Sequence, residues 1–180
     1  MQPVRSVGLL AFAGFLACIP LANFLILHVG TVCVPNGPCL IPVAPNLMAP
    51  SGVMLIGVAL VLRDVLQRCL GKQASLLAIA VGTALSAFIA PPALLLASAG
   101  AFLLSEMADF AVYTPLAQRR LVLAVIASSL VGLVVDSVVF LTLAFGSLEF
   151  LAGQVVGKTW AVLVSIPFIR LLRRAAPSPA

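Results

Sequence analysis

The chain has 180 residues, of which 63% are hydrophobic and 8% are charged, and its mean hydropathy is +1.25. Soluble domains are about 45–50% apolar and about 25% charged, so a water-soluble fold of this size could not bury so much apolar surface. The composition therefore excludes a water-soluble enzyme. The net charge of +5 arises from basic residues that flank apolar segments, so we expect no nucleic-acid partner.

Six apolar segments are long enough to cross a lipid bilayer as helices. They cover about residues 7–29, 53–70, 74–90, 93–113, 121–145 and 150–172. Pro91-Pro92 and Thr114-Pro115 mark the two ends of the fourth segment, because proline disfavours continuation of a helix. No segment shows the long alternating pattern of a membrane strand. The sequence therefore predicts an all-α polytopic membrane protein, with one integral membrane domain over residues 1–180 and six transmembrane helices.

The basic residues outside the helix centres predict the orientation. They occur before the first segment, in alternate connections and after the last segment: Arg5, Arg68, Lys72, Arg119, Arg120, Arg170, Arg173 and Arg174. The other connections contain no Lys or Arg. Because positive residues are retained on the cytoplasmic side, both termini are expected in the cytoplasm and the connection 30–52 on the outer face.

The outer connection 30–52 contains five prolines and no charged residue. Long loops without secondary structure are usually functional or disordered, so this segment is either a lid over the outer mouth or a disordered connector. Cys33 and Cys39 share it, separated by a run that contains Pro-Asn-Gly-Pro and favours a tight turn. An oxidising outer compartment would permit a disulfide between them, and two free thiols are the alternative.

Ionisable residues inside the predicted spans are the candidates for function, since they are expensive in a bilayer and normally face the bundle interior. The set contains four acids and two bases: Asp64, Glu106, Asp109, Asp136, Arg63 and Lys158. Glu106 and Asp109 are three residues apart and share a helical face. The alternative is that these charges only neutralise one another, as in a pair of Asp136 with Lys158 or of Asp64 with Arg68.

Three further features of the spans bear on packing and binding. Gly153 and Gly157 form a GxxxG pattern that lets helices approach closely, either within one chain or between two, so a homodimer remains open. Trp160 faces either lipid or a flat ligand. Asn23 adds a polar group to the first span.

A resemblance to a known family rests on motifs in the last two thirds of the chain. The motifs are Ser105-Glu106-Met107-Ala108-Asp109, Val112-Tyr113, Pro115, the Arg119-Arg120 connection, Val135-Asp136-Ser137-Val138-Val139-Phe140, Asp64-Val65, Gly71-Lys72 and Gly153-Gln154…Gly157-Lys158-Thr159-Trp160. This pattern resembles the vitamin-uptake transporter family, also called the queuosine precursor transporters. Arg63 before the aspartate and Gln67-Arg68 after it depart from the family pattern.

The resemblance implies a multi-pass protein of the bacterial inner membrane that imports 7-deazaguanines such as 7-cyano-7-deazaguanine, and not an enzyme. Such a base presents an N–H and an amine side by side, and one carboxylate can accept both hydrogen bonds. We expect Glu106 to be the main carboxylate, and one of Glu106 and Asp109 to hold a proton, because two close carboxylates disfavour ionisation of both. We expect Asp136 and Lys158 to face each other as a pair of opposite charges. Asp136 is the other candidate, and Lys158 or Asn23 would meet the carbonyl oxygen. Asp64 and Trp160 complete the expected substrate-binding set.

This binding needs neither ATP nor a metal, and the sequence has no phosphate-binding motif, so no cofactor is expected. Two alternatives remain. One is a substrate-binding subunit of an energy-coupled vitamin importer. The other is an intramembrane enzyme that acts on lipid with Glu106 and Asp109 as acid and base.

Overall fold

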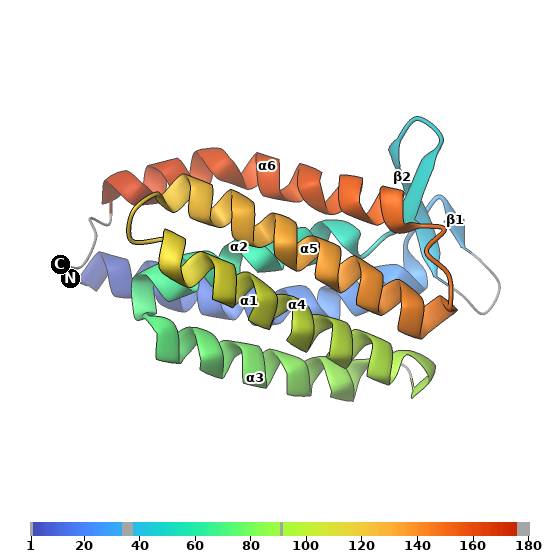
Figure 1. Ribbon diagram of the computed structural model, residues 1–180. Helices are drawn as coiled ribbons and strands as arrows, with labels where there is room; N and C mark the ends of the chain where they lie inside the picture. The colour runs from blue at the N-terminus through green and yellow to red at the C-terminus, as the bar shows by residue number, and fades with distance from the viewer. Residues whose placement is uncertain (1, 34–37, 91, 176–180) are drawn as a thin grey trace.

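The computed structural model describes residues 2–33, 38–90 and 92–175, and this part of the chain is built mainly from six α-helices (Figure 1). The helices are α1 (Gln2–His28), α2 (Val53–Leu70), α3 (Lys72–Ile89), α4 (Leu95–Leu116), α5 (Leu121–Phe145) and α6 (Leu151–Ala175). A short 3-10 helix, η1 (Pro92–Leu94), precedes α4. The three strands are β1 (Val32–Cys33), β2 (Cys39–Ala44) and β3 (Leu47–Pro50).

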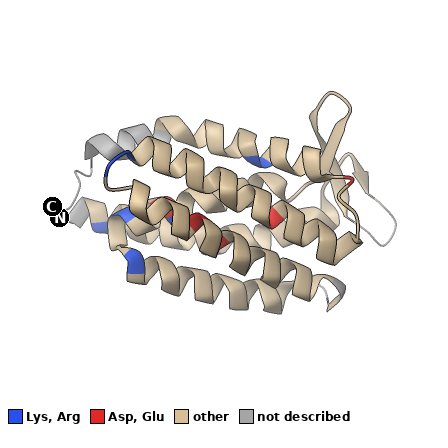
Figure 2. Cartoon of the chain, in the orientation of Figure 1, with Lys and Arg blue, Asp and Glu red and all other residues tan. Residues whose placement is uncertain are grey.

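The helices run alongside one another as an up-and-down bundle, with the small sheet at one end (Figure 1). α1 begins and α6 ends at the opposite end. A Cβ atom at Gly8 would lie 2.6 Å from Leu70 Cγ, so the start of α1 packs against the end of α2. Basic residues gather at this same end of the described bundle (Figure 2), as the positive-inside pattern predicts. The cytoplasmic location of this end remains a prediction.

Four of the described helices are long and apolar enough to cross a membrane: α1 from Val4, α3, α4 and α5. α2 is 18 residues long and carries Arg63, Asp64 and Arg68. These charges lower its hydropathy although most of the helix is buried. The structure therefore supports an all-α membrane protein, and six crossings remain a prediction.

Two hydrophobic clusters hold the bundle together, and α2 contributes to both. One contains Phe15, Leu66 and Phe102 from α1, α2 and α4. The other joins α2 to α4, α5 and α6 around Leu60 and Leu133. Burial of apolar side chains on several sides makes α2 the inner helix of the bundle, which places its charged residues away from lipid. Large apolar side chains elsewhere point outward, as a bilayer would favour.

The connection 30–52, expected on the outer face, is structured in its described residues, and for these the alternative of a disordered connector is wrong. β1, β2 and β3 form an antiparallel sheet in that order, in which Cys33 is paired with Cys39. A disulfide joins these two residues. Asn46 makes the β2–β3 turn with φ 59°, a left-handed conformation that asparagine tolerates. The sequence shows no alternation of apolar and polar residues that would predict these strands, because the segment is apolar on both faces of the sheet.

The sheet packs on α6 through the GxxxG pattern. A Cβ atom at Gly153 would overlap the carbonyl oxygen of Met48 in β3. Gly157 lies against Val43 of β2 and Val53 of α2. In this chain the two glycines therefore serve close contacts within one molecule.

The fourth helix continues past its expected end at residue 113, because α4 passes through Pro115 to Leu116. Proline removes one backbone hydrogen bond, and the last turn is retained by the Ala117 amide, which donates to the Tyr113 carbonyl at 2.9 Å. The predicted ending at Thr114-Pro115 is therefore wrong by one turn.

Candidate functional site

A cavity lies in the half of the bundle nearer the sheet, between the second halves of α1 and α5 and the first turns of α2, α4 and α6. It encloses about 650 Å³ of empty space when its open mouth is included. Its walls are formed by Ile19, Ala22, Asn23, Ile26, Pro50, Gly52, Val53, Ile56, Ser86, Leu94, Ser98, Phe102, Asp136, Phe140, Gln154 and Lys158. The lining is mainly apolar with a few polar groups, as expected for a site that binds an uncharged organic molecule.

An ion pair between α5 and α6 forms the charged part of this wall. Lys158 Nζ lies 2.6 Å from Asp136 Oδ2, and both side chains are almost fully enclosed. The ion pair expected from the sequence is therefore present. Opposite charges in contact offset part of the free energy needed to bury each of them. The wall is thus polar but carries no net charge.

Lys158 has no free donor in this arrangement. Its ammonium group donates to Asp136, to Ser137 Oγ at 2.8 Å and to Gln154 Oε1 at 2.7 Å. An ammonium has three N–H groups, so all of them are used. Lys158 therefore holds Asp136 and Gln154 in place, and it is not set to bind a ligand directly.

Gln154 is oriented by this contact. Because Lys158 donates to Oε1, the amide nitrogen of Gln154 is the end that remains for other partners, and no described residue accepts from it. Asp136 is engaged by Lys158 through Oδ2 only. The cavity therefore carries an amide donor on α6 next to a carboxylate acceptor on α5.

Other groups complete the cavity from the remaining helices. Asn23 Nδ2 donates to the Ile19 carbonyl at 3.0 Å, which leaves its amide oxygen for other partners. Phe102 of α4 and Phe140 of α5 supply aromatic side chains. These groups suit a flat ligand with a polar edge.

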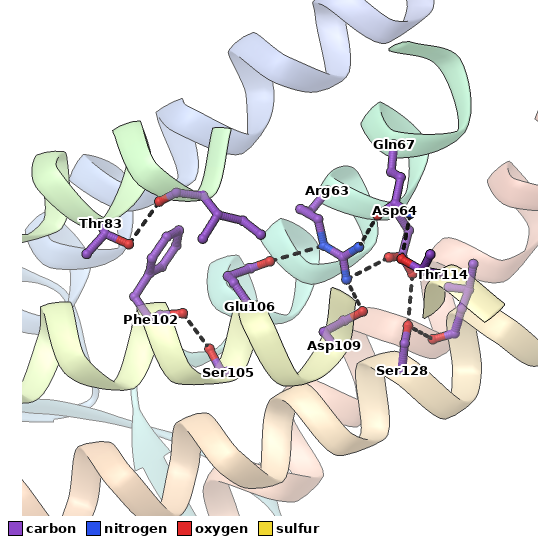
Figure 3. Close-up of polar contacts among 12 residues, drawn as sticks. Arg63, Asp64, Gln67, Thr83, Phe102, Ser105, Glu106, Asp109, Thr114 and Ser128 are labelled. Atoms are coloured by element: carbon purple, nitrogen blue, oxygen red, sulfur yellow. Dashed lines mark hydrogen bonds and ion pairs between the residues drawn. The ribbon is translucent and has the colours of Figure 1, made fainter. Parts of the chain in front are cut away.

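A second cluster of charged groups lies deeper in the bundle, centred on Arg63 of α2 (Figure 3). The guanidinium donates from Nε to Glu106 Oε2 at 3.2 Å and from Nη2 to Asp109 Oδ1. Nη2 also lies 3.0 Å from Asp64 Oδ1. All four side chains are at most 2% exposed. We call these four residues the Arg63 cluster.

Neutral groups surround the Arg63 cluster. Arg63 Nη1 donates to Gln67 Oε1 at 3.0 Å, and Gln67 donates in turn to Thr114 Oγ1 at 3.0 Å. Ser128 Oγ of α5 donates to Asp64 Oδ2 at 3.2 Å. The Arg63 guanidinium lies 5.4 Å from the centre of the Tyr113 ring, which is within the range of a cation–π contact. These contacts join α2, α4 and α5.

The candidate residues from the sequence are thus divided between two places. Asp136, Lys158 and Asn23 line the cavity. The structure brings Asp64, Glu106 and Asp109 together around Arg63, and none of them lines the cavity. Asp64 pairs with its neighbour Arg63, and no ion pair with Arg68 is formed among the described residues.

Trp160 lies apart from both groups. Its side chain is 52% exposed on the outside of α6, where a bilayer would surround it, and it does not line the cavity. Of its two interpretations, the position in the structure favours the lipid-facing one.

Three residues of these two groups are not among the candidates from the sequence, although helical spacing points to each of them. Gln154 precedes Lys158 by four residues, Phe140 follows Asp136 by four, and Gln67 follows Arg63 by four. Side chains four apart share a helical face, so each lies next to a residue already recognised as buried and ionisable. In the described residues no group of three His, Cys, Asp or Glu side chains is arranged to hold a metal ion.

These features define a multi-pass, all-α membrane protein with a mainly apolar cavity inside the bundle that carries a few polar groups. The sequence profile of the family described as "Putative vitamin uptake transporter" matches residues 86–172, from the end of α3 through most of α6. This match confirms the resemblance to the vitamin-uptake transporter family, and it suggests a transporter of the vitamin-uptake type. No protein of curated function and no solved structure matches the chain.

Proposed function

We propose that this protein imports a neutral, purine-like base of the queuosine precursor class, a 7-deazaguanine such as 7-cyano-7-deazaguanine, across the bacterial inner membrane. The observation that carries the proposal is the Asp136–Lys158 pair in the cavity wall. A wall with no net charge disfavours a strongly ionic substrate, whereas its carboxylate and amide match the alternating donors and acceptor of a guanine-like edge.

In the proposed complex, Asp136 accepts hydrogen bonds from the ring N–H and the exocyclic amine. Each carboxylate oxygen has two lone pairs, so the hydrogen bond from Lys158 leaves room for these donors. The Gln154 amide donates to the carbonyl oxygen of the base. Lys158 thereby becomes a positioning residue, since it sets the orientation of both groups that touch the substrate.

The apolar part of the cavity supports the same class of substrate. Phe102 and Phe140 are placed to contact the faces or edges of a flat ring, and Asn23 adds an amide from the opposite helix. A base without sugar or phosphate also fits the absence of a charged lining beyond the Asp136–Lys158 pair among the described residues.

The test is uptake of labelled 7-cyano-7-deazaguanine by a queuosine-auxotrophic bacterial strain that expresses the chain. We expect wild type to restore uptake, and Asp136→Asn to abolish it in cells with matched amounts of membrane-inserted protein. Glu149→Gln is the matched control, since Glu149 is an exposed acid outside both groups. Failure of wild-type protein to take up any 7-deazaguanine would overturn the proposal.

The same uptake measured in proteoliposomes of purified protein decides how the transporter operates. A self-standing transporter carries the base without another protein. If uptake requires an ATPase that co-purifies with the chain, the chain is instead the substrate-binding subunit of an energy-coupled vitamin importer. Formation of a chemically altered product in detergent would indicate the intramembrane enzyme.

A further inference from the structure

The Arg63 cluster has more acids than it has positive charge to balance them. Arg63 faces three carboxyl groups, Asp64, Glu106 and Asp109, all buried between α2, α4 and α5. If all three were ionised, two negative charges would be left without a partner among buried side chains. A buried charge without a partner is strongly disfavoured, and a carboxyl group can avoid it by binding a proton.

The hydrogen bonds point to where the protons reside. Asp109 Oδ2 is buried and has no hydrogen-bond partner, while Asp109 Oδ1 contacts Arg63. Asp64 Oδ1 has the ion pair with Arg63 but no well-directed hydrogen bond. Buried carboxyl oxygens that accept no hydrogen bond are rare when the group is ionised, because an ionised carboxylate normally accepts several hydrogen bonds. One arginine nitrogen also holds Asp64 and Asp109 close to each other, which disfavours two negative charges there.

A metal ion is a poorer explanation for the same excess of acids. The guanidinium of Arg63 already occupies the space between the three carboxyl groups, so a second cation there would be repelled by it. We propose that the Arg63 cluster is a proton-binding site, in which Asp64, Glu106 and Asp109 share two protons and one negative charge that pairs with Arg63.

Other titratable groups face the cluster from the elements packed against it. Tyr113 of α4 lies beside the guanidinium, and Arg68 of α2 acts on Tyr113. From α5, Asp136 acts electrostatically on Glu106. Lys158 of α6 is paired with Asp136 and reduces its effect. None of these neighbours supplies a second positive charge in contact with the three acids, so the cluster still has more acids than Arg63 can balance.

Glu106 connects the cluster to the cavity. It follows Phe102, which lines the cavity, by one helical turn on the same face of α4. Asp136 lines the cavity and repels a negative charge on Glu106. The proton-binding site and the cavity wall are therefore neighbours on one face of α4.

This connection gives the transporter a driving ion, and this part of the inference rests on the proposed function. The base binds from the outer side while the cluster holds its two protons. After the base is released, one O–H bond of the cluster breaks, the electron pair stays on the carboxylate oxygen, and the proton passes to cytoplasmic water. A hydronium ion from the outer side restores this proton before the next base binds. One proton thus enters the cell with each base.

The proton site is tested first without any substrate. Infrared spectroscopy of the purified protein at neutral pH, in H₂O and D₂O, detects the C=O stretch of protonated carboxylic acids. We expect this band in wild type, and a loss of intensity in Asp109→Asn or Asp64→Asn. Glu149→Gln should leave it unchanged, because Glu149 is exposed and lies outside the Arg63 cluster. Absence of the band, or a band that Asp64→Asn, Glu106→Gln and Asp109→Asn all leave intact, would overturn the proton site.

Coupling is then tested in proteoliposomes with labelled 7-cyano-7-deazaguanine. We expect an acidic exterior to drive accumulation at least fivefold above equilibrium, and a protonophore to abolish that accumulation. Asp109→Asn should still exchange internal for external base but should not accumulate it. Accumulation by wild type that ignores the pH gradient would overturn the coupling. Lack of any transport by wild type would instead overturn the proposed function, and the infrared result would stand by itself.

Discussion

Lys158 Nζ donates to Asp136 Oδ2 at 2.6 Å, and this contact joins α6 to α5 at the wall of the cavity. The lysine uses its other two N–H groups on Ser137 and Gln154. One buried cation therefore sets the orientation of a carboxylate and an amide that both line the cavity. The stability of this region and the chemistry of binding depend on the same residue.

Removal of only one member of this pair should destabilise the protein. Asp136→Asn leaves the Lys158 charge buried without its counter-ion, which is expected to lower the free energy of unfolding by about 3 kcal/mol. Asp136→Asn combined with Lys158→Met removes both charges and should recover most of that stability. Thermal unfolding of the two variants in detergent measures the difference. Equal loss of stability in the single and the double variant would contradict a buried ion pair.

The disulfide between Cys33 and Cys39 should be detectable and should stabilise the sheet. Mass spectrometry of non-reduced peptides is expected to show the cross-linked form in protein from cells with an oxidising periplasm. Replacement of both cysteines by serine should lower stability by about 2 kcal/mol, because the disulfide closes a short loop. Two free thiols in protein from such cells would be inconsistent with an outer location of the sheet.

The contact of the sheet with α6 can be tested at one glycine. Gly153→Ala should destabilise the protein, since the new Cβ atom would overlap the Met48 carbonyl. Gly100→Ala is the matched control on α4, where the nearest side chain would be 3.7 Å away. There alanine should stabilise the helix by up to about 1 kcal/mol. If the two variants unfold at the same temperature, the sheet does not pack on α6 as described.

The orientation in the membrane predicts opposite results for two reporter fusions. A reporter that is active only in the cytoplasm should work when it is fused after Ala180. It should fail when it is inserted at Asn46, in the turn between β2 and β3, because that end of the bundle is expected outside. The reverse pattern would overturn the orientation and would place Cys33 and Cys39 in a reducing compartment.

The sequence predicted the helices better than their connection at the sheet. Helix positions follow from the length of apolar segments, and the observed α2 and α5 match the expected residues 53–70 and 121–145. The strands carry no such signal. Prolines at 42, 45 and 50 and the apolar character of both faces conceal the period of two, and the strands depend on packing against α6.

Spacing along one helix was not enough to predict which charged residues pair between helices. Composition predicted that buried charges would face inward and that Asp136 would pair with Lys158. It could not show that Arg63 takes Asp64, Glu106 and Asp109 as partners, because this depends on the rotation of α2 against α4. Helical spacing offered Arg68, four residues after Asp64, as its partner, because side chains four apart share a helical face. It did not point to the adjacent Arg63.

The central claim is that Asp136, and not Glu106, accepts the hydrogen bonds from the ring N–H and the exocyclic amine of the base. The most direct measurement compares the affinity of the purified protein for 7-cyano-7-deazaguanine and for the analogue that lacks the exocyclic amine. Wild type should prefer the amine-bearing base by about tenfold or more, since hydrogen bonds to charged groups contribute about 1.5–3 kcal/mol. Asp136→Asn should lose this preference, and Glu106→Gln should retain it. If Glu106→Gln loses the preference while folded Asp136→Asn retains it, the two assignments must be exchanged.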